Sequence, residues 1–108
     1  MKLPVDALIA PEKLTGYLLQ RREDNDKSGF LAVAGYTTAH AAQLDTDLRA
    51  QILPLSAEPA GTTPYGDKFV IHGMLRGPNG RTLRVLSVWM REKATGQTKF
   101  ITLYPDPS

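Results

Sequence analysis

Apolar residues in the first half of the chain recur at the three- and four-residue spacing of an amphipathic helix. Leu14, Tyr17 and Leu18 fall at i, i+3 and i+4 after Pro11, which suits a first helical turn. A longer stripe of the same kind runs from Ala41 until a proline ends it. This pattern predicts helices over residues 11–22, 30–34 and 38–53, the second ended by Gly35 and the third begun by Thr37 or Thr38.

The second half follows a period of two, the spacing of β-strands. Strands are expected over residues 66–75, 81–92 and 99–105. The sequence PNG at 78–80 suits a type I turn between the first two strands, and a turn with Gly96 joins the last two. The chain is therefore predicted to have an α+β fold, with two or three N-terminal helices packed on a three- to four-stranded antiparallel meander.

A chain of 108 residues fits a single domain, residues 1–108. We expect a helical half over 1–53, a surface connection over 54–65 that is rich in Pro, Ala, Thr and Gly, and a β-meander over 66–105. The N-terminal stretches MKLP and ALIA are candidates for an additional short edge strand.

Composition indicates the cellular compartment expected for the protein. The chain has no cysteine, which fits a reducing cytoplasm and excludes disulfides and thiolate metal sites. Its N-terminus lacks the apolar core of a signal peptide, and no apolar run approaches the ~20 residues that span a bilayer. We therefore expect a cytoplasmic protein without membrane contact.

Charge is unevenly divided between the two halves. Residues 1–65 carry six Lys and Arg against eight Asp and Glu, whereas residues 66–108 carry seven against three. The basic half is the predicted sheet, which suits a phosphate-bearing partner. Strands also carry cations to prevent aggregation, so this feature leaves the function open.

Strand alternation sorts the side chains of the sheet onto two faces. In the simplest assignment the helices cover the aliphatic sets, namely Phe69, Ile71 and Leu75, then Leu86, Val88 and Met90, then Ile101 and Leu103. The open face then gathers Lys68, His72, Arg76, Ser87, Trp89, Arg91, Thr102 and Tyr104. Burial of large aromatics favours the opposite assignment, with Trp89 and Phe100 in the core.

The open-face set combines cations for phosphate, aromatic rings for base stacking, and groups that transfer protons. His72 is the only histidine of the β half and suits acid–base chemistry near neutral pH. We find no zinc-ligand spacing, phosphate-binding loop or nucleophile elbow, so no metal or cofactor is expected.

The order of short motifs, MKLP, EKLTGYLL, KSGFLAVAGYT, YGDKFVIHGMLRGPNGR, SVW and FITLYP, resembles a small bacterial family of uncharacterised domains. The resemblance runs from Met1 to Pro105. Such domains occur alone and at the C-terminal ends of polymorphic toxins. Their layout is similar to the barnase/EndoU/colicin/RelE-like ribonucleases.

The resemblance implies a metal-independent, RNA-cleaving, toxin-like domain. Its motifs fall on Lys27, on Ser87 and Trp89, and on Thr102 and Tyr104. Together with the residue chemistry, this predicts Lys27, His72, Thr102 and Tyr104 as catalytic residues and Arg81, Arg84, Ser87 and Trp89 as substrate-binding residues. Gly29 and Asp26 stand where the family pattern often has a cation and a histidine.

Three functions remain open at this point. A ribonuclease would have RNA as substrate and an antitoxin or immunity protein as partner. A non-catalytic module would bind protein or nucleic acid through the same face, with Trp89 as its main contact. An accessory protein would pair through its last strand and form a dimer, within the limit that Pro105 sets.

Overall fold

The computed structural model describes residues 1–19 and 28–106. The predicted α+β fold is confirmed, with the four strands in the sheet order β1-β2-β3-β4 and every neighbouring pair antiparallel. The helical segments are α1 (Pro11–Lys13), η1 (Leu14–Leu18), α2 (Ser28–Ala32), η2 (Thr38–His40), α3 (Ala41–Asp47) and η3 (Leu48–Ile52). The strands are β1 (Glu58–Thr63), β2 (Gly66–Arg76), β3 (Thr82–Glu92) and β4 (Thr98–Pro105).

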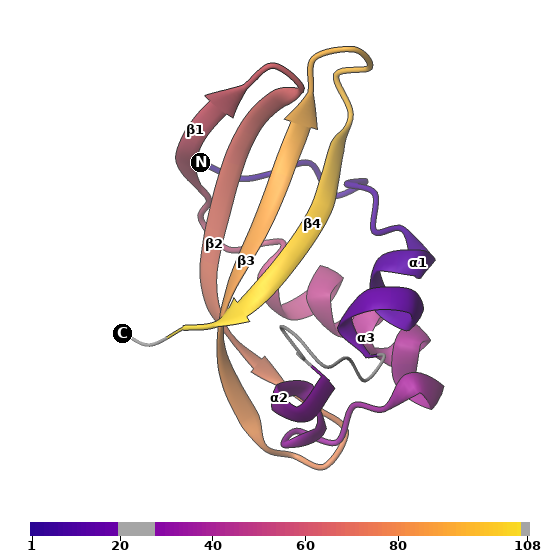
Figure 1. Ribbon diagram of the computed structural model, residues 1–108. Helices are drawn as coiled ribbons and strands as arrows, with labels where there is room; N and C mark the ends of the chain where they lie inside the picture. The colour runs from indigo at the N-terminus through magenta and orange to yellow at the C-terminus, as the bar shows by residue number, and fades with distance from the viewer. Residues whose placement is uncertain (20–27, 107–108) are drawn as a thin grey trace.

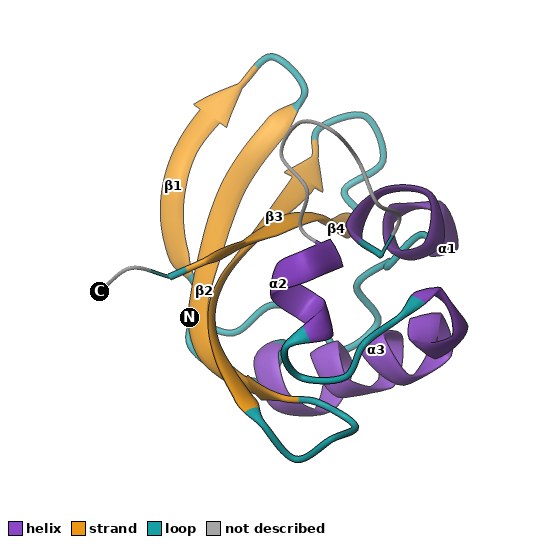
Figure 2. Cartoon of the chain, turned by 60° about the horizontal axis from the view of Figure 1, so that its bottom comes forward, coloured by secondary structure: helices purple, strands orange, loops and turns teal. Residues whose placement is uncertain are grey.

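The helical segments all lie on one side of a strongly twisted sheet (Figures 1 and 2). We call that side the helix-covered face and the other side the uncovered face. The end of β4 leads away from the helices (Figure 1). One layer of helices on one layer of sheet is the minimal way to bury a single sheet face.

Two expectations about the edges of the sheet need correction. The predicted connection over residues 54–65 contains β1, which pairs with β2 from Glu58↔Val70 to Thr63↔Gly66. Its Pro and Gly content hid a strand that is bulged between Pro59 and Thr62. The N-terminal segment forms only a single parallel bridge, Leu8↔Lys99, against the outer edge of β4.

The hairpin loop between β2 and β3 docks on the end of α2. The N–H of Tyr36 donates to the Leu31 carbonyl and the N–H of Gly35 to the Ala32 carbonyl, which is a Schellman ending with Gly35 at φ +93°. Asn79 then donates from its side chain to Val33 O, at 3.0 Å, and from its backbone to Ala34 O. The expected PNG turn therefore also caps a helix.

Glycine is required at position 77 of this loop. A Cβ there would lie 2.1 Å from the carbonyl oxygen of Ala34, which is backbone and has no room to move aside. The close approach of the loop to α2 therefore depends on the missing side chain.

The face assignment of β3 was wrong, and the alternative with the aromatic residues in the core is correct. Phe69, Ile71 and Leu75 of β2 face the helices as predicted, and their partners in β3 are Trp89, Ser87 and Leu83. Directly opposed residues of an antiparallel pair share a face. Trp89 and Ser87 are 0% exposed, so Leu86, Val88 and Met90 lie on the uncovered face instead.

A chain of buried hydrogen bonds ties Trp89 to the neighbouring strand. The indole Nε1 donates to Ser87 Oγ at 2.8 Å, and Ser87 Oγ donates to the Ile71 carbonyl at 3.1 Å. Trp89 also meets its cross-strand partner Phe100 edge to face, with ring centroids 5.2 Å apart. The indole N–H and the Ser87 hydroxyl therefore both have hydrogen-bond partners inside an apolar core.

A bulge in β4 interrupts the alternation of its side chains. Two neighbouring inward-facing residues, Phe100 and Leu103, are three positions apart instead of two. Trp89 pairs with Phe100 but Val88 pairs with Thr102, which leaves Ile101 as the extra residue. Phe100 and Leu103 both become buried, at 1% and 0% exposure. The period of two that the sequence suggests for β4 therefore breaks at Ile101.

A second polar cluster, with the buried Tyr36–Asp47 hydrogen bond at its centre, joins the helices to the end of β2. The Tyr36 hydroxyl donates to Asp47 Oδ2 at 2.5 Å, and Gln43 donates to Asp47 Oδ1 at 2.8 Å. The Gln51 side chain pairs with both backbone groups of Arg76, at 2.7 and 3.1 Å. Burial, with the hydrogen bond to the Asp47 carboxylate, raises the pKa of Tyr36 far above its usual value.

In the described ranges, 1–19 and 28–106, no helix combines the length and the apolar composition needed to cross a bilayer.

We predict that stability falls in alkaline solution because of Tyr36. The folded state resists ionisation of this phenol and the unfolded state does not. The contribution of Tyr36 to the free energy of unfolding is therefore fully present below the ordinary pKa of 10.0 and declines as the pH rises above it. Tyr36→Phe should cost about 1–3 kcal/mol near neutral pH, because buried Asp47 loses a donor.

Urea unfolding of both proteins over a pH series tests this prediction. The stability gap between the wild type and Tyr36→Phe should shrink above pH 10.0, since the variant lacks the penalised ionisation. All other tyrosines and lysines are common to both proteins and cancel in the difference. A gap that stays constant to high pH contradicts the prediction.

Candidate functional site

The uncovered face brings together residues from β2, β3 and β4. The register aligns two rows across these strands, Val70 with Val88 and Thr102, and His72 with Leu86 and Tyr104. His72, Met74 and Tyr104 are exposed there. Neighbouring strands lie about 4.8 Å apart, which separates the Cα atoms of His72 and Tyr104 by about 10 Å across Leu86.

His72 is held by a carboxylate from the end of the chain. Its Nδ1 lies 2.8 Å from Asp106 Oδ2. The side chain of His72 is 46% exposed, whereas that of Asp106 is only 5% exposed. The pair therefore has a buried acid beneath a histidine that is open to solvent.

Strand pairing continues past Pro105 and positions this acid. The Asp106 N–H donates to the Arg84 carbonyl at 2.9 Å, which extends the β3–β4 ladder by one more bond. The Asp106 side chain then reaches across β3 toward His72 on β2. Together with Gly73, Met74 and Arg84, the pair lines an open cleft of about 340 Å³.

The geometry determines which nitrogen of neutral His72 carries the proton. An ionised carboxylate only accepts hydrogen bonds, so Nδ1 must be the donor to Asp106. The lone pair of neutral His72 is then on Nε2. A carboxylate–histidine pair of this kind can take a proton from a bound hydroxyl and later return it, beside the guanidinium of Arg84.

The predicted site residues divide into three groups. His72, Tyr104 and Arg84 do lie on one face, and Arg84 shares the cleft with His72. Thr102 lies on the same face but is only 6% exposed, and Arg81 is exposed in the hairpin loop. Ser87 and Trp89 are fully buried on the helix-covered face, because their side chains bond to each other and to β2.

Lys27 lies outside the described residues, so its catalytic assignment stays a prediction.

Sequence reasoning missed Asp106 and Met74. Asp106 follows the last predicted strand and looks like part of a polar tail. The sequence did offer one indication: Asp106 is two residues after Tyr104, and residues two apart on a strand share a face. Met74 was passed over as one more apolar strand residue, yet it is 52% exposed.

Among the residues that the structure describes, no three His, Cys, Asp or Glu side chains are grouped closely enough to hold a metal ion.

We predict that Asp106 fixes the tautomer of His72. In the neutral state, ¹⁵N NMR of the imidazole should show a protonated Nδ1 and an unprotonated Nε2. Asp106→Asn should shift this balance toward the other tautomer, because an amide NH₂ can donate to an unprotonated Nδ1. His40, whose Nδ1 accepts from the Thr37 N–H, is the internal reference. Identical His72 spectra in both proteins contradict the prediction.

No curated protein and no solved structure matches this chain. The sequence matches, over residues 3–107, the family described as a domain of unknown function (DUF6883). This confirms the expected kinship to an uncharacterised domain family, while the link to toxins and ribonucleases stays a prediction. With nearly all of its length covered, the chain belongs to this DUF6883 family.

Proposed function

We propose that the uncovered sheet face binds RNA and cleaves its backbone without a metal ion, with His72 as the general base. The observation that carries the proposal is the 2.8 Å contact from His72 Nδ1 to buried Asp106, which leaves Nε2 as the reactive nitrogen in a cleft shared with Arg84. The toxin-like role rests on the family resemblance, and the chemistry rests on these three side chains.

The first half of the reaction needs a base and a countercharge. Nε2 of His72 takes the proton of a ribose 2′-OH, and the 2′-oxygen attacks the adjacent phosphorus. Negative charge then grows on the non-bridging phosphate oxygens, where the Arg84 guanidinium donates charge-assisted hydrogen bonds. Arg76 lies exposed on the same face, and it extends the positive charge along β2.

The second half needs a proton for the departing oxygen. Tyr104, across Leu86 from His72, is 47% exposed and supplies that proton to the 5′-oxygen. The P–O5′ bond breaks, and a 2′,3′-cyclic phosphate and a 5′-hydroxyl result. The separation of about 10 Å between the Cα atoms leaves room for a phosphate between the two side chains.

Lys27 enters the proposal only through the family motif, as a second cation for the phosphate. Ser87 and Trp89 take no part in it, because neither is accessible. Thr102 is nearly buried beside Val88, so we assign it no chemical step.

The second candidate function is a non-catalytic protein-binding module on the same face. It is favoured by the exposed apolar surface of Met74 and Tyr104 beside half-buried Val70, Leu86 and Val88. Large exposed apolar side chains on one face are typical of interaction sites. An antitoxin or immunity protein that covers the face would be compatible with either function.

The test is cleavage of total RNA by the purified protein in excess EDTA. We expect cleavage to 2′,3′-cyclic phosphate ends, with a loss of about 10²–10⁴-fold in His72→Ala and a smaller loss in Asp106→Asn. The matched control is His40→Gln, which removes the other histidine, at the N-cap of α3, and should retain activity.

The outcomes separate the two candidates. Unchanged cleavage in His72→Ala shows that the activity belongs to another site or to a contaminant. If the wild type cleaves no RNA over a range of substrates and pH, the catalytic proposal is wrong. In that case, loss of partner binding on Met74→Lys would support the binding module.

A further inference from the structure

We infer a second binding site, independent of the proposed RNA site, for a small amphipathic carboxylate. It is a cleft of about 570 Å³ between residues 1–4 and the helix-covered side of the sheet. This volume lies within the range of small-molecule sites. Its β3 residue, Arg91, is five positions from Leu86 and on the opposite face, so the cleft is separate from that of His72.

The floor of the cleft is apolar and firmly held. Leu3 and Phe69 are 6% and 8% exposed, and Pro4 adds to the same surface. The N–H of Ala57 donates to the Met1 carbonyl at 2.7 Å, and the N–H of Ala7 donates to Pro4 O at 3.1 Å. The N-terminal segment is therefore a defined wall of the cleft.

Two cations supply the polar part of the lining. Lys2 donates to the Pro54 carbonyl at 2.6 Å, and this neutral acceptor leaves the ammonium charge in place beside the cleft. Arg91 is exposed and makes no hydrogen bond or ion pair with any side chain in the described part of the structure. A guanidinium beside an apolar floor fits a planar carboxylate attached to an apolar body.

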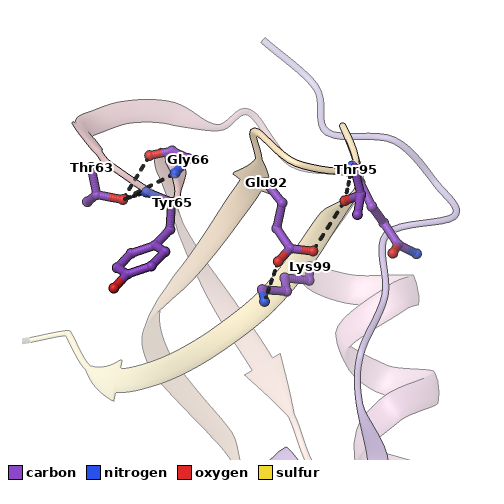
Figure 3. Close-up of polar contacts among 7 residues, drawn as sticks. Thr63, Tyr65, Gly66, Glu92, Thr95 and Lys99 are labelled. Atoms are coloured by element: carbon purple, nitrogen blue, oxygen red, sulfur yellow. Dashed lines mark hydrogen bonds and ion pairs between the residues drawn. The ribbon is translucent and has the colours of Figure 1, made fainter.

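The acids near Arg91 form no ion pair with it among the described residues. Glu92 points to the other side of the sheet, where Lys99 at 3.0 Å and Thr95 at 3.3 Å hold its carboxylate (Figure 3). The hydrogen bond from Lys99 lowers the pKa of Glu92, and its carboxylate therefore pairs with Lys99 and not with Arg91. Asp67 lies opposite Arg91 across the strands but accepts from Thr62 and forms no ion pair with Arg91.

The chemical class follows from this combination. An apolar floor selects a ring or a short aliphatic body, and the positive charges of Lys2 and Arg91 in the lining favour a monoanion over its neutral analogue. The distinguishing property is therefore a preference for a carboxylate over an isosteric amide of the same shape. Hydrophobic contact alone would bind both compounds equally.

The experiment is a ¹H–¹⁵N NMR titration of the full chain with 2-naphthoate and, separately, with 2-naphthamide. We expect shifts at Leu3, Arg91, Gly96 and Thr98, with naphthoate binding about five- to ten-fold more tightly than naphthamide. Arg91→Gln should abolish that preference, whereas Arg84→Gln, on the uncovered face, should preserve it.

A second variant, Asp67→Asn, tests the charge dependence of binding from the other side. Asp67→Asn removes the only carboxylate that opposes Arg91 across the strand pair and should tighten naphthoate binding without changing naphthamide binding. The inference is overturned if neither compound binds or if both bind equally. Shifts centred on His72 instead of Arg91 would also overturn it.

Discussion

The hydrogen-bonded chain from the Trp89 indole through the Ser87 hydroxyl to the Ile71 carbonyl decides which side of the sheet faces the helices. The indole N–H cannot be buried without an acceptor, and an unsatisfied one costs about 1–3 kcal/mol. Ser87, two residues away on the same face, supplies that acceptor. Its own hydroxyl donates a hydrogen bond to the Ile71 carbonyl of β2. The largest buried side chain of the core is thus fully hydrogen-bonded on the helix-covered face.

The candidate site is a consequence of this choice. With Trp89 inward, the even positions of β2 and β3 turn outward, so His72 and Arg84 share the uncovered face. The bulge at Ile101 then shifts β4 by one residue and turns Tyr104 and Asp106 to the same side. A straight β4 would leave Phe100 and Leu103 on opposite faces, and one of them would be exposed.

Much of this architecture could be predicted because it rests on local signals. The helical stripes, the Gly35 helix end and the PNG turn are set by backbone chemistry within a few residues. The inward face of β3 could not be read from β3 alone, since both of its faces are apolar. The five-residue loop 77–81 only pairs odd positions of β2 with odd positions of β3, and the buried Trp89–Ser87 pair turns that shared face toward the helices. Parity with Tyr104 indicates the face of Asp106, but its contact with His72 depends on the order of three strands, which the sequence does not show.

Quenching of Trp89 fluorescence by acrylamide in the native protein would report directly which face of the sheet this side chain occupies. The chain has one tryptophan, so the signal belongs to a single side chain. A Trp89 side chain buried under the helices should give a blue-shifted emission and strong protection from the quencher, both lost on unfolding. A native emission and quenching rate like those of the unfolded chain would place Trp89 on the open face. The uncovered site of His72, Arg84 and Asp106 would then be wrong.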